Sequence, residues 1–274
     1  MSHLVKVCVN FITNLDKTMK KILGVGFIAC ALTACGGGSD GDSYNGVDGG
    51  GKDPVVNAET LGVYTGTTNQ GQDVVGLVDK NKKFWFLYTP PYRSGVTGFI
   101  TGNFTVSGNT VKATNGKDFY FGGSTVYDTT LNGTVDAKKS LNGTISYSSS
   151  NQVSFNTVYD AQANNTNADL STISGTYSGT SAIVQGIEGA GLTISNTGDV
   201  SGTGQSGCNY SGTAVAVPDT PYYSINLVFG GSPCYLARQE VKGVAYYDLA
   251  NKTLYAVAET SSRQNAVLYL GVKR

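Results

Sequence analysis

From about residue 60 onward, apolar and polar residues alternate along short stretches that end at turn-forming residues. One such series lies in the middle of the chain and a second in its carboxyl-terminal half. Their apolar members are Leu131, Val135, Leu141, Ile145, Tyr147, Val153 and Phe155, then Tyr223, Ile225, Leu227 and Phe229. A period of two residues is typical of antiparallel strands with one buried face. The pattern predicts an all-β fold.

Turn signals divide the predicted strands. Lys138-Lys139 and Ser149-Ser150-Asn151 are expected turns, and Asn115-Gly116 predicts a β-hairpin because both residues tolerate positive φ. The run from Gly202 to Gly207 has the glycine spacing of a dinucleotide-binding loop, but another predicted strand follows it instead of a helix, so we interpret it as a turn. Helix is expected only as a turn or two over residues 160–170.

Two segments of the chain resemble each other. Leu61–Thr67 and Ser174–Thr180 share Gly, Tyr, Gly and Thr at an offset of 113 residues, and Leu131–Gly133 matches Val241–Gly243 less closely at an offset of 110. We predict two tandem antiparallel β-meander domains, residues 58–163 and 164–274, each a small barrel or a barrel-like sandwich, with a polar linker over 161–167. Chance similarity in a Gly- and Thr-rich chain is the alternative.

The amino-terminal region has the features of an export signal. The basic segment Met19-Lys20-Lys21 precedes an apolar run of about 11 residues, Ile22–Leu32. Such a run is too short to span a bilayer, which takes about 20 apolar residues. Residues 19–34 are therefore predicted to be a signal peptide. Residues 1–18 do not fit it, and we expect translation to start at Met19.

The next residues, Leu32-Thr33-Ala34-Cys35, resemble the lipobox of bacterial lipoproteins. The resemblance implies that Cys35 carries the lipid and becomes the first residue of the mature chain, so that the protein is anchored to a membrane. Gly36 follows where Asp often signals inner-membrane retention, so the outer membrane is expected, with the periplasmic or the surface side left open. Residues 35–57 are Gly-rich and predict a flexible tether.

Cysteine usage supports an exported protein. Cys8 and Cys30 precede the cleavage point and Cys35 is used for lipid, so Cys208 and Cys234 are left in the folded part. Two remaining cysteines in an exported chain predict a disulfide. A pair of free buried thiols is the alternative.

The scarcity of catalytic residue types argues against an enzyme. The only histidine is His3, outside the mature chain, which excludes Ser-His-Asp catalysis and His-ligated metals. The glutamates Glu59, Glu188, Glu240 and Glu259 form no recognisable pair. No cofactor or metal is expected. From Cys35 onward there are 15 basic and 18 acidic residues without a basic cluster, so nucleic acid is not an expected partner.

An aromatic run, Phe84–Tyr88, carries bulk on both faces of a predicted strand. We expect core on one side and an interdomain or loop contact on the other; a binding surface is the alternative. The stiff segment after it places Tyr88, Tyr92 and Arg93 around two prolines. Tyr and Arg are enriched at interface hot spots, so these three residues are a candidate binding loop.

Three functions follow from these features. The leading hypothesis is an outer-membrane-anchored, noncatalytic module that binds a protein, a glycan or a small ligand. A lipocalin-like carrier of a small apolar ligand is the second. A carboxylate-based hydrolase of envelope glycans is the third, and it requires two acidic groups about 5 to 9.5 Å apart.

Overall fold

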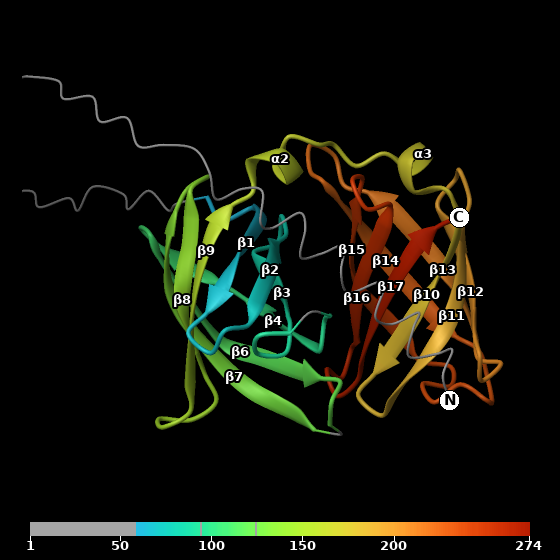
Figure 1. Cartoon of the computed structure of the whole chain (residues 1–274), viewed down its shortest axis with the longest axis horizontal. Helices are drawn as coiled ribbons and strands as arrows, with labels where there is room; N and C mark the ends of the chain where they lie inside the picture. Colours follow the sequence, from blue (N-terminus) through green and yellow to red (C-terminus); the bar gives the residue numbers. More distant parts are fainter. Residues whose placement is uncertain (1–58, 94, 124) are drawn as a thin grey trace, which may run out of the picture. The chain divides into compact units, whose positions relative to one another are not determined.

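The computed structural model describes residues 59–274 apart from residues 94 and 124. The predicted signal peptide, Cys35 and the predicted tether lie outside these residues. The described residues form one compact unit that contains two antiparallel β-barrels in tandem (Figure 1). The prediction of an all-β fold is confirmed, and both repeats are closed barrels.

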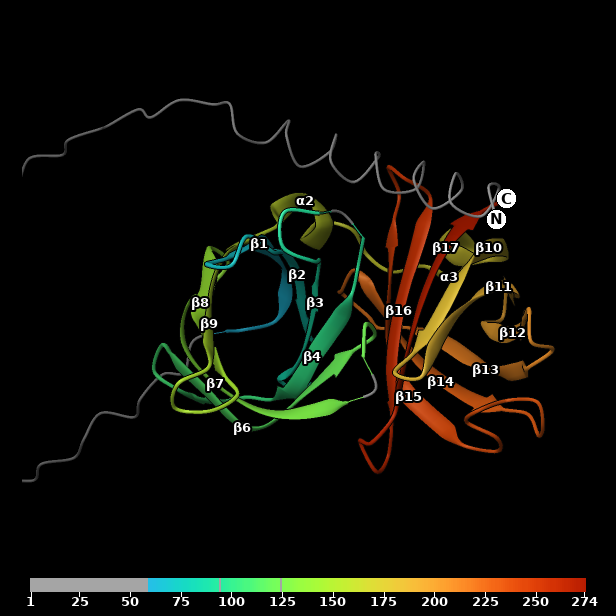
Figure 2. The ribbon, with the colours of Figure 1, turned by 60° about the horizontal axis from the view of Figure 1, so that its bottom comes forward.

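The first barrel is a ring in which β1 pairs with β9 and β4 pairs with β6 (Figure 2). The short β5 pairs with the start of β6. The strands are β1 (Gly62–Thr68), β2 (Asp73–Val78), β3 (Lys83–Tyr88), β4 (Gly98–Asn103), β5 (Thr105–Ser107), β6 (Thr110–Tyr120), β7 (Val126–Asp136), β8 (Ser140–Ser146) and β9 (Gln152–Tyr159). The turns expected at Lys138-Lys139 and Ser149–Asn151 connect β7 to β8 and β8 to β9.

In the second barrel each strand pairs with the next, and β10 pairs with β17 to close the ring. The strands are β10 (Gly175–Ile183), β11 (Gly186–Ile194), β12 (Asp199–Gly204), β13 (Asn209–Ala216), β14 (Tyr222–Phe229), β15 (Glu240–Asp248), β16 (Thr253–Thr260) and β17 (Ala266–Lys273). Gly202–Gly207 covers the end of β12 and the turn before β13, as expected.

Two short helices connect the barrels. Helix α2 (Ala161–Asn164) begins after Asp160, whose side chain accepts a hydrogen bond from the Ala163 amide, and α3 (Leu170–Ile173) begins after Asp169, which accepts one from Ser171. An acceptor at this position satisfies an amide that has no partner within the helix. Among the described residues, no helix has the length and hydropathy of a membrane-spanning segment.

The two similar sequence segments have the same local structure. Gly66 in β1 and Gly179 in β10 each lie against the adjacent strand so closely that a Cβ would be 1.9 Å from a main-chain oxygen, that of Asn156 or Leu270. Two residues earlier, the hydroxyls of Tyr64 and Tyr177 each donate to the carbonyl four residues back in the chain. The repeat in the sequence therefore corresponds to a repeat in the packing.

Large side chains fill the interior of each barrel. Inward-facing residues of the first barrel include Tyr64, Phe84, Phe86, Phe104 and Phe155, all at most 5% exposed. The second interior is packed in the same way around Tyr177, Tyr210, Tyr223, Phe229, Tyr247 and Tyr269. Alternation along the strands directs these side chains inward.

Apolar side chains also pack between the barrels. Phe84 and Phe86 of β3 face the first interior, whereas Trp85 belongs to a separate cluster with Tyr222, Val257 and other residues of the second barrel. Core on one side and an interdomain contact on the other is the arrangement that we expected for Phe84–Tyr88. The Tyr222 hydroxyl also accepts a hydrogen bond from the Lys80 amide.

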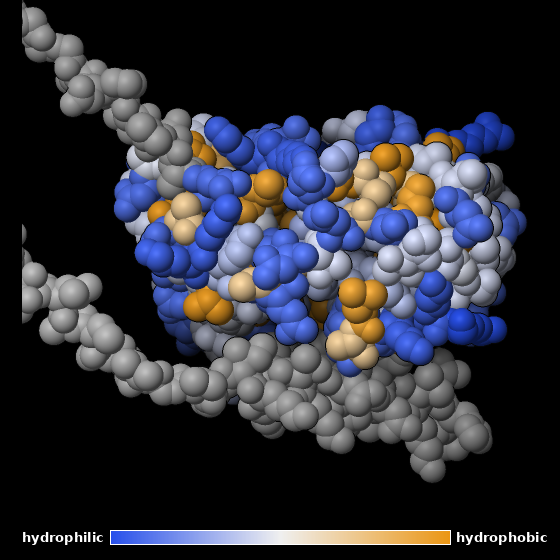
Figure 3. All heavy atoms as spheres, turned by 90° about the horizontal axis from the view of Figure 1, so that it is seen from above, coloured by the Kyte–Doolittle hydropathy of each residue, from blue (hydrophilic) through white to orange (hydrophobic). Residues whose placement is uncertain are grey.

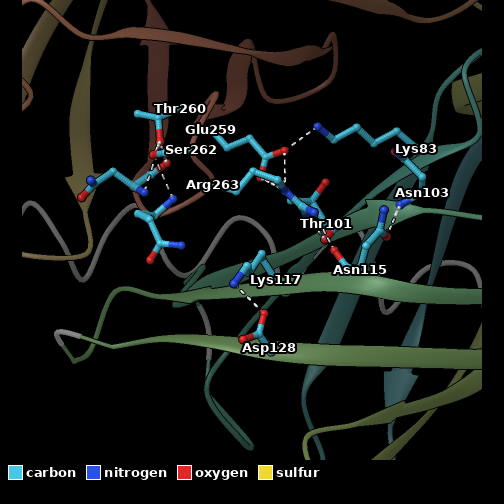
Figure 4. Close-up of polar contacts among 12 residues, drawn as sticks. Lys83, Thr101, Asn103, Asn115, Lys117, Asp128, Glu259, Thr260, Ser262 and Arg263 are labelled. Atoms are coloured by element: carbon cyan, nitrogen blue, oxygen red, sulfur yellow. Dashed lines mark hydrogen bonds and ion pairs between the residues drawn. The ribbon is translucent and has the colours of Figure 1, made fainter.

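A polar network borders this apolar contact (Figure 4). Glu259 of β16 accepts from Lys83 of β3 at 2.5 Å and from Nε of Arg263 at 3.0 Å. The Arg263 guanidinium also donates to the main-chain oxygens of Thr101 and Asn115 in the first barrel.

The prediction of a β-hairpin at Asn115-Gly116 is wrong. Both residues lie inside β6, where the register with β7 shifts between Ala113 and Gly116. Gly116 allows β6 to lie close to the Thr129 side chain of β7, because a Cβ there would be 2.2 Å from Oγ1 of Thr129. The segment is a β-bulge, which also places the Asn115 carbonyl to accept from Arg263.

Candidate functional site

A pocket of about 280 Å³ opens at the end of the second barrel where β10 finishes and β11 begins. Its walls are apolar, with a few polar groups at Ser181, Gln185, Glu188 and Ser206. A concave apolar site with few polar groups is typical of ligand pockets, and this volume is just below their usual range of about 300 to 1,000 Å³.

The segment between β14 and β15 covers one side of this pocket. Cys208 and Cys234 form a disulfide, as predicted, which ties this segment to the start of β13. Leu236 is 1% exposed and fixes the segment to the core, while Tyr235 beside it is 62% exposed at the pocket. The disulfide therefore holds one rim of the pocket in place.

The opposite rim and the floor complete the apolar surface. Ile187, at the β10–β11 turn, is 63% exposed and lines the pocket. Tyr210 and Phe229 form the floor, with ring centroids 5.6 Å apart. Large apolar side chains that stay exposed at a rigid recess are typical of binding sites. On the face drawn in Figure 3, by comparison, apolar residues form small groups among polar ones.

Glu188 is the charged residue of the pocket lining. Its Oε2 accepts a hydrogen bond of 2.7 Å from the Ser206 amide, and its carboxylate lies against Gly204, where a Cβ would clash with Oε1 at 2.2 Å. Burial and then the Glu188 charge raise the pKa of the Tyr210 phenol. A carboxylate and a neutral phenol therefore lie close together at the pocket.

The same end of the first barrel is almost closed. Thr68, the counterpart of Ser181 at the offset of 113 residues, lines a cavity of only about 40 Å³. Tyr88 and Tyr147 also line it, and their hydroxyls donate to the two carboxylate oxygens of Asp118 at 2.7 Å each. Burial raises the pKa of Asp118, which these two hydrogen bonds lower to a smaller extent. Of these two cavities, the one in the second repeat is the larger.

Comparisons with known proteins do not identify a family. No protein family matches this chain, and no curated protein does. Among the solved structures that resemble it weakly, two serve as examples. One is transferrin binding protein B from serogroup B Neisseria meningitidis, with 10% identity, a TM-score of 0.29, and coverage of 74% of this chain and 59% of that one. The other is a protein of unknown function from the DUF3598 family of Nostoc punctiforme, with 9% identity, a TM-score of 0.29, and coverage of 78% and 96%.

These similarities are too low to assign a function. This chain spans only 59% of the length of the transferrin binding protein. The described residues contain no group of three or more His, Cys, Asp or Glu side chains that could hold a metal ion.

The structure separates the residues of the candidate binding loop. Tyr88 points into the first barrel, toward Asp118, whereas Tyr92 is 86% exposed and Arg93 is also exposed. Tyr92 has a φ of 56°, and its amide donates to the Gly71 carbonyl. A binding role for Tyr92 and Arg93 stays a prediction, but Tyr88 is not available at the same surface.

The sequence by itself does not group the pocket residues. Glu188, Tyr210, Phe229 and Tyr235 come from four separate segments and form no motif. One signal was present in the sequence: residues 140–237 contain no Lys or Arg, so Glu188 has no basic neighbour along the chain.

Proposed function

We propose that this protein is a noncatalytic binding lipoprotein, anchored through Cys35 to the outer membrane, which engages its partner at the pocket of the second barrel. The observation that carries the proposal is the recess between Ile187 and Tyr235, two large apolar side chains that are more than 60% exposed. The lipobox resemblance of Leu32–Cys35 supports the anchor.

The alternatives have less support. A carrier of an apolar ligand needs an interior cavity, whereas the described interiors are packed with aromatic side chains and the cavity in the first barrel measures about 40 Å³. A glycan hydrolase needs a second carboxylate beside the first. Glu188 is the acidic residue of the pocket lining, while Asp118 and Glu259 are buried elsewhere.

Partner capture tests the site. The full chain, purified with its acyl group from the envelope, is immobilised and exposed to envelope extract and to host fluids. Ile187→Ser and Tyr235→Ser should each reduce the captured partner at least tenfold, because exposed apolar anchors dominate binding energy. Val215→Ser is the matched control, since Val215 is 55% exposed on β13 outside the pocket lining. If no partner is enriched, or if the rim variants capture as much as the native chain, the proposal fails. A Tyr92→Ala variant tests the separate loop.

The anchor is tested independently. The native chain should incorporate labelled palmitate and fractionate with the outer membrane, and Cys35→Ser should do neither. Fractionation of the serine variant with the envelope, together with an unlabelled native chain, would refute the anchor. Protease treatment of whole cells then distinguishes the surface from the periplasmic side.

A further inference from the structure

The Glu188 carboxylate differs from the other glutamates of the described chain. Glu59, Glu240 and Glu259 each form an ion pair with Lys or Arg. Among the described residues, 59–93, 95–123 and 125–274, Glu188 has no such partner within 4.0 Å, and it accepts a hydrogen bond from the neutral Ser206 amide. A half-buried carboxylate is thus held at an apolar pocket without a cation from the protein.

Aromatic rings surround the same space. Tyr210, Phe229 and Tyr235 line the pocket together with Glu188. The faces of aromatic rings attract cations, and this attraction grows where water is excluded. A carboxylate combined with several rings favours a ligand group that is both positively charged and attached to apolar carbon atoms.

The charge of the surrounding sequence acts in the same direction. Residues 140–237, which include β10 to β14, contain five acidic residues and no Lys or Arg. Arg238, the first basic residue after this stretch, is not part of the pocket lining. An approaching cation therefore meets no fixed positive charge from these strands.

We propose that the pocket binds an alkylammonium or guanidinium group on an apolar stem, with Glu188 pairing with the cation and the rings of Tyr210, Phe229 and Tyr235 packing against the stem. The proposal rests on the proposed binding function and adds the chemistry of the bound group. A lysine or arginine side chain of a protein partner carries this group, and so does a free alkylamine. The pocket volume of about 280 Å³ suits one such group rather than a large ligand.

Titration of the full chain in detergent with small probes tests the proposal. The amide resonance of Ser206 reports directly on the pocket, because this amide donates to Glu188. The cationic probes are Nα-acetyl-lysine methylamide, Nα-acetyl-arginine methylamide and butylammonium. Their neutral counterparts are the norleucine and citrulline methylamides. The cationic probes should shift the Ser206 resonance and bind at least tenfold more tightly than the neutral ones.

Two variants separate charge from shape. Glu188→Gln keeps an oxygen that accepts from Ser206 but removes the charge, and it should weaken the cationic probes at least tenfold. Glu240→Gln removes a carboxylate that pairs with Lys242 outside the pocket, and it should change their affinity less than twofold. Tighter binding of the blocked amino acids than of butylammonium supports a protein side chain as the source, and the reverse supports a free amine.

The proposal is overturned if neutral probes bind as well as cationic ones, if Glu188→Gln binds like the native chain, or if no cationic probe moves the Ser206 resonance. These results leave the proposed function standing as long as partner capture still depends on Tyr235. Loss of that dependence would refute the proposed function instead.

Discussion

Lys83 of the first barrel and Glu259 of the second form an ion pair in which Nζ and Oε1 are 2.5 Å apart. Glu259 is 5% exposed and also accepts from Arg263, which in turn donates to two carbonyls of the first barrel. One buried carboxylate thus organises two cations at the contact between the barrels. Such an arrangement is costly to break, because the two cations would stay partly shielded from water without their carboxylate partner.

Glu259→Gln should therefore lower the free energy of unfolding by about 2 kcal/mol. This is below the roughly 3 to 5 kcal/mol typical of a fully buried pair, since Lys83 and Arg263 are each 25% exposed. Urea unfolding measures the change. The control is Glu240→Gln, whose exposed pair with Lys242 is screened by water, so that its removal should leave the urea midpoint nearly unchanged. Equal stability of the two variants would contradict this role for Glu259.

Gly66 and Gly179 should tolerate no side chain. An added Cβ would lie 1.9 Å from a main-chain oxygen in each barrel, so the paired strands must move apart. We expect Gly66→Ala and Gly179→Ala each to cost about 3 kcal/mol or more, as overpacking does at its upper range. Gly186→Ala is the control, because nothing lies within 4 Å of its Cβ position. If the urea midpoints of the three variants coincide, the close packing at Gly66 and Gly179 is refuted.

The Cys208–Cys234 disulfide should stabilise the chain by about 3.5 kcal/mol, because it closes a loop of 26 residues and restricts the unfolded state. Reduction should lower the urea midpoint, and the Cys208→Ser/Cys234→Ser double variant should match the reduced native chain. The same variant should also weaken binding at the pocket, since the rim that holds Tyr235 is released. An unchanged midpoint after reduction would show that the bridge does not contribute.

Local patterns were enough to predict the strands, but they left a closed barrel and a barrel-like sandwich as alternatives. Alternation along β7 to β9 identified which residues face inward, and Tyr88 follows Phe84 and Phe86 on the interior face for the same reason. Closure depends on the pairing of β1 with β9 and of β10 with β17, which are far apart in the sequence. At Asn115-Gly116 the local hairpin signal was misleading, because both residues lie inside β6, where the register with β7 shifts and forms a bulge.

The pocket could be predicted only in part, for the same reason. Counting the cysteines predicted the bridge between Cys208 and Cys234. Glu188, Tyr210 and Tyr235 lie far apart in the sequence and come together only in the folded barrel, so no short motif contains them. The absence of Lys and Arg from residues 140–237 was visible in the sequence, but its meaning depends on knowing which carboxylate lines a recess.

Asp118 should make the stability of the first barrel depend on pH. It is 4% exposed, and burial raises its pKa even though Tyr147 and Tyr88 donate to it. A raised pKa means that the folded chain holds this proton more tightly than the unfolded chain does. The group therefore favours folding at low pH, and this contribution is lost as the pH rises through the folded-state pKa.

Asp118→Asn removes this titration while keeping a side chain of similar shape. The native chain should gain stability relative to the Asn variant as the pH falls from about 7 toward 4, in urea unfolding measured across that range. Asp128→Asn, at a side chain that is 86% exposed, controls for the loss of a carboxylate on the same barrel. A difference between the native chain and Asp118→Asn that stays constant with pH would mean that Asp118 ionises alike in the folded and unfolded chains. In that case the Tyr88 and Tyr147 hydroxyls would compensate fully for its burial.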